Sequence, residues 1–139
     1  MKDRIPYLKA LTPEAKAALA GDLQLLPQLP FRVGRESRSE ERGALFADSR
    51  RQVNSMPNND LYLPEAGSEL NVSREHFLID FQDGQYVCVD RGSSCGTIVE
   101  GEPIGSKRPS FVRKLENHDV IVVGTSRSKY VFKFLVKGE

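Results

Sequence analysis

Cysteine and histidine are scarce in this sequence of 139 residues, which contains two of each. Two cysteines are too few for a disulfide scaffold, and Cys88, Cys95, His76 and His118 lack the spacing of a zinc site. No apolar run approaches the length of a transmembrane helix, and the first residues lack the apolar core of a signal peptide. We therefore expect a cytoplasmic protein that uses no metal, cofactor or membrane.

Excess charge of one sign is also missing. The 20 basic and 19 acidic residues leave a net charge of +1, which argues against a general nucleic-acid binder because such proteins carry a clear basic excess. The hydrophobic fraction of 39% and the charged fraction of 28% are ordinary for a globular protein. The length predicts one domain over residues 1–139.

The N-terminal part predicts a strand followed by a short helix. Residues 5–11 form an apolar run with a proline near its start, which favours an edge strand. Thr12 suits a helix N-cap and Pro13 the first helical turn. The alanine-rich residues 15–20 have high helix propensity, and Gly21 ends the pattern.

Short apolar runs separated by turn residues follow, and a charged, turn-rich stretch at residues 36–58, which reads as a long loop, interrupts them. The predicted strands are Leu23–Leu26, Phe31–Val33, Asp60–Leu63, His76–Phe81, Tyr86–Asp90, Thr97–Val99, Pro103–Ile104, Val120–Val123 and Tyr130–Val136. Residues 115–119 read as a turn. Many short strands at this spacing predict an all-β sandwich.

Polar residues gather where these runs begin or end, at residues 34–35, 73–76 and 92–97. An arginine, several hydroxyls and glycine-rich backbone suit a phosphate better than they suit a reaction, because arginine stays charged and presents a planar fork of donors. Cys95 with His76 would be the one nucleophile pair to imagine, but no third group orients it. A thiol enzyme is therefore a remote alternative, and we expect no catalysis.

Several of these segments together resemble the forkhead-associated (FHA) domain family. The motifs, in the family's order, are Phe31-Arg32-Val33-Gly34-Arg35, Asn59-Asp60-Leu61-Tyr62-Leu63, Val72-Ser73-Arg74-Glu75-His76-Phe77, Asp90-Arg91-Gly92-Ser93-Ser94-Cys95-Gly96-Thr97 and Leu115-Glu116-Asn117-His118-Asp119-Val120-Ile121. The match is strongest over residues 31–136, and residues 1–30 can supply the first strands and the helix. The resemblance implies a sandwich of two mostly antiparallel sheets with about eleven strands.

The family resemblance also implies a function, the binding of a threonine-phosphorylated protein or peptide. By position, Arg35 would contact the phosphate and Ser73 would donate a hydrogen bond to it. The expected ligand-binding residues are Arg35, Ser73, Arg74, Ser94 and Cys95, and the expected supporting residues are Gly34, His76 and Gly96. Such a module would serve signalling or regulated assembly.

The sequence departs from the family pattern at three places. Cys95 stands where the family usually has an asparagine that holds the main chain of the ligand, and a thiol is a weaker donor and acceptor. This departure leaves open an alternative, a module that docks its partner without phosphate. His118 stands where a glycine is usual, and the loop at residues 36–58 is longer than usual and starts right after Arg35.

Overall fold

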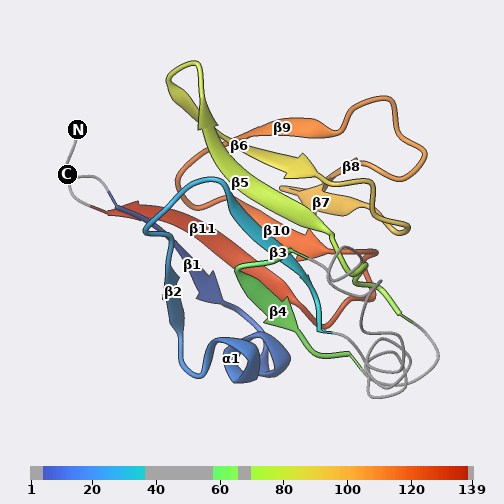
Figure 1. Ribbon diagram of the computed structural model, residues 1–139, viewed down its shortest axis with the longest axis horizontal. Helices are drawn as coiled ribbons and strands as arrows, with labels where there is room; N and C mark the ends of the chain where they lie inside the picture. Colours follow the sequence, from blue (N-terminus) through green and yellow to red (C-terminus); the bar gives the residue numbers. More distant parts are fainter. Residues whose placement is uncertain (1–4, 37–57, 66–69, 138–139) are drawn as a thin grey trace, which may run out of the picture.

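The computed structural model describes residues 5–36, 58–65 and 70–137, and these residues form two β-sheets with a short helix at one side (Figure 1). One sheet has six strands in the order β2-β1-β11-β10-β7-β8, and the other has five in the order β4-β3-β5-β6-β9. Every strand pair is antiparallel except β3 with β4, which is parallel. The prediction of an eleven-stranded, mostly antiparallel sandwich is confirmed for the described part of the chain.

The strands are short. The six-stranded sheet consists of β1 (Ile5–Ala10), β2 (Leu23–Leu25), β7 (Thr97–Val99), β8 (Glu102–Ile104), β10 (Val120–Val123) and β11 (Val131–Lys137). The five-stranded sheet consists of β3 (Phe31–Arg35), β4 (Leu61–Leu63), β5 (Phe77–Gln82), β6 (Gln85–Asp90) and β9 (Val112–Leu115).

Alternating side chains from both sheets meet in one core. Phe132 and Phe134 on β11 are fully buried, as are Phe77 and Ile79 on β5. Each pair is two residues apart, so both members point to the same face of their strand. The inner faces of the two sheets thus share one hydrophobic cluster, which gives the loops at the sheet ends a rigid base.

The helix α1 (Pro13–Leu19) begins as its sequence predicts. The hydroxyl of Thr12 accepts a hydrogen bond from the backbone N–H of Ala15, and Pro13 fills the first helical position. The helix ends at Ala20, which adopts the left-handed conformation with a φ of 56°. Because the helix has only seven residues, it depends on the packing of Ala15 against the core.

One strand prediction was wrong, and one strand was missed. The strand at residues 5–11 is not at an edge, because β2 folds back and pairs with β1 on the side opposite β11. The strand β9 was not predicted, and its last residue, Leu115, was assigned to a turn. It is an edge strand whose Val112 is exposed, so its sequence lacks the alternation that marks a half-buried strand.

The described chain ends lie away from the connections that carry the polar motifs. Ile5 and Lys137 are paired in neighbouring strands, and Figure 1 shows this end of the sheet opposite the β4–β5 and β6–β7 connections. No helix in the described ranges is long and apolar enough to cross a membrane. Most of the expected long loop, residues 37–57, lies outside the described residues.

Candidate functional site

Three polar segments, far apart in the sequence, meet at one end of the sandwich. The backbone N–H of Arg35, at the end of β3, donates to the carbonyl of Ser73 at 2.9 Å. The Ser73 hydroxyl accepts from the backbone N–H of Ser94 at 3.0 Å. The β4–β5 connection therefore lies between the end of β3 and the β6–β7 turn, and it brings these expected ligand-binding residues together.

Arg35 is nearly buried, with 7% of its surface exposed. The strand β3 extends to this residue because Gly34 and Arg35 pair with Tyr62 and Leu63 of β4. The Arg35 Nε donates to the carbonyl of Val72 at 3.0 Å. This bond fixes the plane of the guanidinium against the β4–β5 connection.

Gly34 is required by a close approach between two backbones. A β-carbon at this position would overlap with the carbonyl oxygen of Arg74 and would lie 2.7 Å from the Asn59 side-chain nitrogen. The same Arg74 carbonyl accepts a hydrogen bond from Asn59 at 2.7 Å. Gly34 thus supports the site by letting the β4–β5 connection lie directly on β3.

His76 links two of the three segments. Its Nδ1 accepts from the backbone N–H of Ser73 at 2.9 Å, so its Nε2 is the protonated nitrogen and donates to the Gly96 carbonyl at 2.7 Å. Burial lowers the pKa of His76, which keeps the ring neutral, as this pair of bonds requires. Both nitrogens are engaged, so His76 is in no position to take a proton from Cys95.

Asp90 organises the β6–β7 turn and was not recognised as a functional residue in the sequence. Its carboxylate is buried and accepts four hydrogen bonds, from the backbone N–H groups of Gly92 and Ser93 and from the hydroxyls of Ser93 and Thr97. The signal was present, because an aspartate that precedes a Gly-Ser pair by two residues has the spacing of a side-chain-capped turn.

The tip of this turn carries Ser94 and Cys95 with different exposures. Ser94 is exposed, and its carbonyl accepts a hydrogen bond from the Ser106 hydroxyl at 2.9 Å. Cys95 is half-buried, and its thiol lies 3.6 Å from the Leu70 carbonyl. Gly96 follows with a φ of 83°, a conformation that other residues adopt only under strain.

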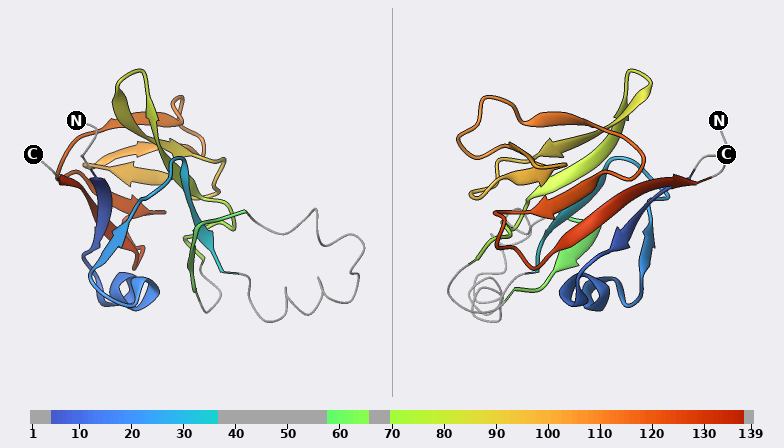
Figure 2. Two further views of the ribbon diagram at one scale, coloured as in Figure 1. Left: turned by 60° about the vertical axis from the view of Figure 1, so that its left-hand side comes forward. Right: turned by 180° about the vertical axis from the view of Figure 1, so that it is seen from behind.

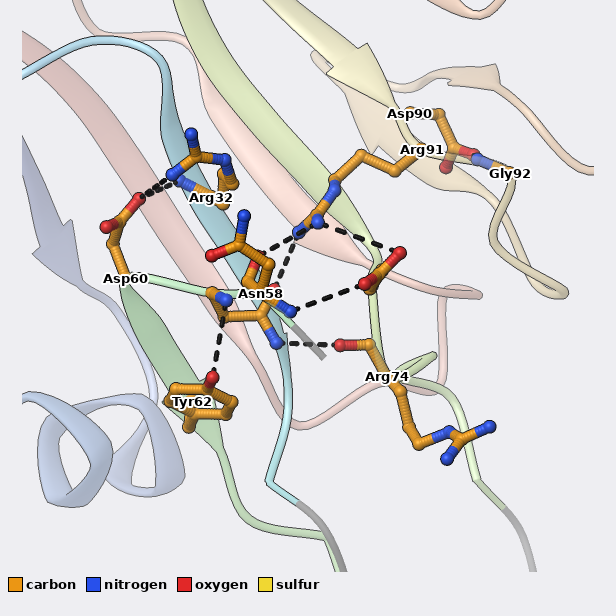
Figure 3. A network of polar contacts seen from close by, with 10 residues as sticks. Arg32, Asn58, Asp60, Tyr62, Arg74, Asp90, Arg91 and Gly92 are labelled. Atoms are coloured by element: carbon orange, nitrogen blue, oxygen red, sulfur yellow. Dashed lines mark hydrogen bonds and ion pairs between the residues drawn. The ribbon is translucent and has the colours of Figure 1, made fainter. Parts of the chain in front are cut away.

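A polar network holds the backbone at Arg74 (Figure 3). Arg91 donates to the Asn59 side-chain oxygen at 2.6 Å and to the Asn58 carbonyl at 2.9 Å, and it lies 3.8 Å from the carboxylate of Glu75. Asn59 in turn binds the Arg74 carbonyl. Figure 3 shows the Arg74 guanidinium directed away from this network. It is exposed and has no ion-pair partner within the described ranges.

The chemistry available at this end is recognition of an anion. Hydroxyls, backbone N–H groups and arginines meet there, whereas no three histidine, cysteine, aspartate or glutamate side chains gather as metal ligands in the described part of the chain. The second cysteine, Cys88, is fully buried, and burial raises the pKa of its thiol. It packs as a small hydrophobic residue in the core.

Comparison with known families places the site in context. Residues 31–124 match the FHA domain family, and this match includes all the expected ligand-binding and supporting residues. It covers more than half of the chain, and no catalytic domain is detected. No curated protein is significantly similar to the chain.

Solved structures agree on the fold. The FHA domain of CT664 from Chlamydia trachomatis is 23% identical, with a TM-score of 0.57 over 94% of this chain and 96% of that one. Full-length yeast Pml1p is 20% identical, with a TM-score of 0.66 over 96% and 83%. Mycobacterium tuberculosis EmbR, solved with a low-affinity phosphopeptide, is 23% identical, with a TM-score of 0.58 over 97% of this chain and 25% of its own.

Proposed function

The chain belongs to the FHA domain family, and we propose that it binds phosphothreonine peptides at the end of the sandwich where β3, the β4–β5 connection and the β6–β7 turn meet. The ligand class is typical of the family, and the EmbR structure contains a phosphopeptide. The roles of Arg35, Ser73, Arg74, Ser94 and Cys95 as ligand-binding residues stay predictions that binding experiments must test.

The observation that carries the proposal is the bond between Ser94 N–H and the Ser73 hydroxyl oxygen. Because this hydroxyl accepts from the backbone, its own proton remains available for donation. The next residue, Arg74, has an exposed guanidinium. A hydroxyl donor and a cation on one connection, held beside the backbone of Arg35, suit an anion with several acceptor oxygens.

Phosphate matches this arrangement in charge and in hydrogen-bonding capacity. A phosphothreonine carries about −1.5 to −2 charges at neutral pH and three strong acceptor oxygens. Hydrogen bonds to charged groups contribute about 1.5–3 kcal/mol each, so two or three of them with some side-chain packing reach micromolar affinity, about −8 kcal/mol.

The decisive experiment compares one peptide with and without phosphate on its threonine, by isothermal titration calorimetry. We expect binding of the phosphorylated form only. Ser73→Ala should weaken it about tenfold, because it removes one charge-assisted hydrogen bond. Arg35→Lys should weaken it at least about tenfold, because lysine keeps the charge but loses the planar fork.

The matched control is Arg113→Lys, which makes the same change at a residue paired with Glu102 and Asp119 on the β9 side of the sheet. The affinity of Arg113→Lys for the phosphorylated peptide should stay within about twofold of the wild-type affinity. Thermal unfolding of each variant separates lost binding from lost folding. Equal binding of the two peptides by the wild type would refute the proposal and favour docking without phosphate.

A further inference from the structure

The β8–β9 connection, residues 105–111, lies against the turn that carries Ser94 (Figure 2). The Ser106 hydroxyl donates to the Ser94 carbonyl at 2.9 Å. A β-carbon on Gly96 would lie 3.6 Å from the Ser106 β-carbon and 3.9 Å from the Arg108 Nη1. Arg108 therefore lies beside the β6–β7 turn, although it is far from the family motifs in sequence.

This connection has a defined shape. The Gly105 N–H donates to the Ser110 carbonyl at 2.8 Å, and the Arg108 N–H donates to the Gly105 carbonyl at 2.9 Å. A β-carbon on Gly105 would overlap with the Asp90 carboxylate. The base of the connection therefore packs on the residue that organises the β6–β7 turn, and the position of Arg108 relative to Ser94 is set by the fold.

The connection is also cationic. Residues 103–115 contain no aspartate or glutamate. Lys107 and Arg108 are exposed, and neither side chain has an ion-pair partner in the part of the chain that the structure describes. The neighbouring Arg113, in contrast, is paired with two carboxylates. An arginine without a carboxylate partner beside a ligand-binding turn is available for a carboxylate of the ligand.

We propose that Arg108 is a specificity-determining residue that selects peptides with an aspartate or glutamate near the phosphothreonine. This inference rests on the proposed function. In this proposal, a peptide whose phosphate lies at Arg35 and Ser73 passes the β6–β7 turn, where the Arg108 guanidinium can bind a carboxylate through two parallel hydrogen bonds. Because the Cys95 thiol is only a weak hydrogen-bond donor for the backbone of the ligand, a contact between Arg108 and a ligand side chain contributes a larger share of the selectivity among peptides.

The test begins with an oriented phosphothreonine peptide library in which one position at a time carries aspartate, glutamate or alanine. The wild type should enrich acidic residues at one or more positions. Two peptides that differ only in aspartate or alanine at the most enriched position are then titrated against the wild type. The aspartate form should bind about fivefold more tightly, as expected of an exposed ion pair of about 1 kcal/mol.

Arg108→Ala should abolish this preference and leave the affinity for the alanine peptide within about twofold of the wild type. Arg108→Glu should reverse the preference, so that a lysine at that position binds better than aspartate. Lys137→Ala is the matched control, because it removes an exposed cation at the opposite end of the sheet, and it should retain the wild-type preference.

Several outcomes would overturn the role of Arg108. The first is that the wild-type protein requires the phosphate but shows no preference for acidic residues. The second is that Arg108→Ala keeps the preference for the aspartate peptide. The third is that Arg108→Ala loses affinity equally for the aspartate and the alanine peptide. A wild type that binds the peptide equally with and without phosphate would refute the proposed function as well, so the two failures are distinguishable.

Discussion

The buried carboxylate of Asp90 gives the sharpest prediction, because one atom change tests whether it holds the β6–β7 turn. Asp90 is 3% exposed, and its four bonds range from 2.7 to 2.9 Å. In Asp90→Asn, one oxygen can still accept from the two backbone N–H groups. The new amide NH₂, however, would face the hydroxyls of Ser93 and Thr97, which in the wild type donate to the carboxylate oxygen at that position.

The expected cost follows from the number and kind of these bonds. Hydrogen bonds to a charged group contribute about 1.5–3 kcal/mol each and neutral ones about 1 kcal/mol. All four bonds at Asp90 lose the charge, and the two hydroxyls must rotate away from the amide. We therefore expect Asp90→Asn to lower the free energy of unfolding by about 3 kcal/mol.

Urea denaturation measures this cost directly. With a denaturant slope of about 2 kcal/mol per M, the unfolding midpoint should fall by about 1.5 M. Asp80→Asn is the control, because Asp80 binds only the Phe81 N–H and the Gln82 amide near the surface of the sheet, and it should cost less than about 0.5 kcal/mol. A shift for Asp90→Asn no larger than that of the control would refute the structural role assigned here.

Two further predictions concern the histidines. His118 has a φ of 82°, a conformation that favours glycine. His118→Gly should therefore raise the free energy of unfolding by about 0.5–1 kcal/mol in the same urea assay. His118→Ala keeps the backbone strain and should not raise it. Burial lowers the pKa of His76 in the folded protein, so the unfolded chain binds more protons than the folded one below about pH 6.5. The free energy of unfolding should therefore fall as the pH falls from about 7 to about 5.5, by at most about 1.4 kcal/mol per pH unit. His76→Gln should remove this component and His118→Gly should retain it, and equal pH profiles for wild type and His76→Gln would contradict the assignment.

Local signals in the sequence predicted much of the fold. The strands predicted at residues 76–81 and 86–90 form the β5–β6 hairpin, and Asp83 and Gly84 between them have positive φ values, 53° and 80°, as a two-residue hairpin turn requires. The helix start was predicted from Thr12 and Pro13. In each case residues within one turn of each other determine the local structure, so the sequence alone carries the information.

The errors arose where pairing between distant residues decides the outcome. The strand β1 lies inside its sheet because Leu23–Leu25 pairs with it, and nothing within residues 5–11 reports this. The edge strand β9 pairs with one neighbouring strand only and needs little side-chain burial to do so. Its apolar residues, such as the exposed Val112, therefore do not alternate with polar ones as they do in a half-buried strand.

The same distinction applies to the site. The order of the motifs predicted that Arg35, Ser73 and Ser94 would come together. In the structure the backbone N–H of Arg35 donates to the Ser73 carbonyl, and the backbone N–H of Ser94 donates to the Ser73 hydroxyl. The residues that hold the turns in place, such as Asn59, act across the fold. Arg108 follows no family motif and lies near the turn only because the β8–β9 connection folds onto it.

The connections at this end are therefore held by one another before any ligand arrives, and this has a consequence for how variants will behave. His76 is neutral and forms its bonds within the protein, so its loss should weaken binding of every phosphopeptide alike and leave the salt dependence of binding unchanged. Arg35 and Arg108 carry charges that a ligand would meet, and screening acts on such contacts over about 8–10 Å at physiological salt. Loss of either arginine should make binding less sensitive to salt, because one attractive charge is gone. Affinities measured at low and high salt for His76→Gln, Arg35→Ala and Arg108→Ala therefore separate a residue that shapes the site from residues that contact the ligand. A His76→Gln variant that changes the salt dependence of binding as much as Arg108→Ala does would contradict this division.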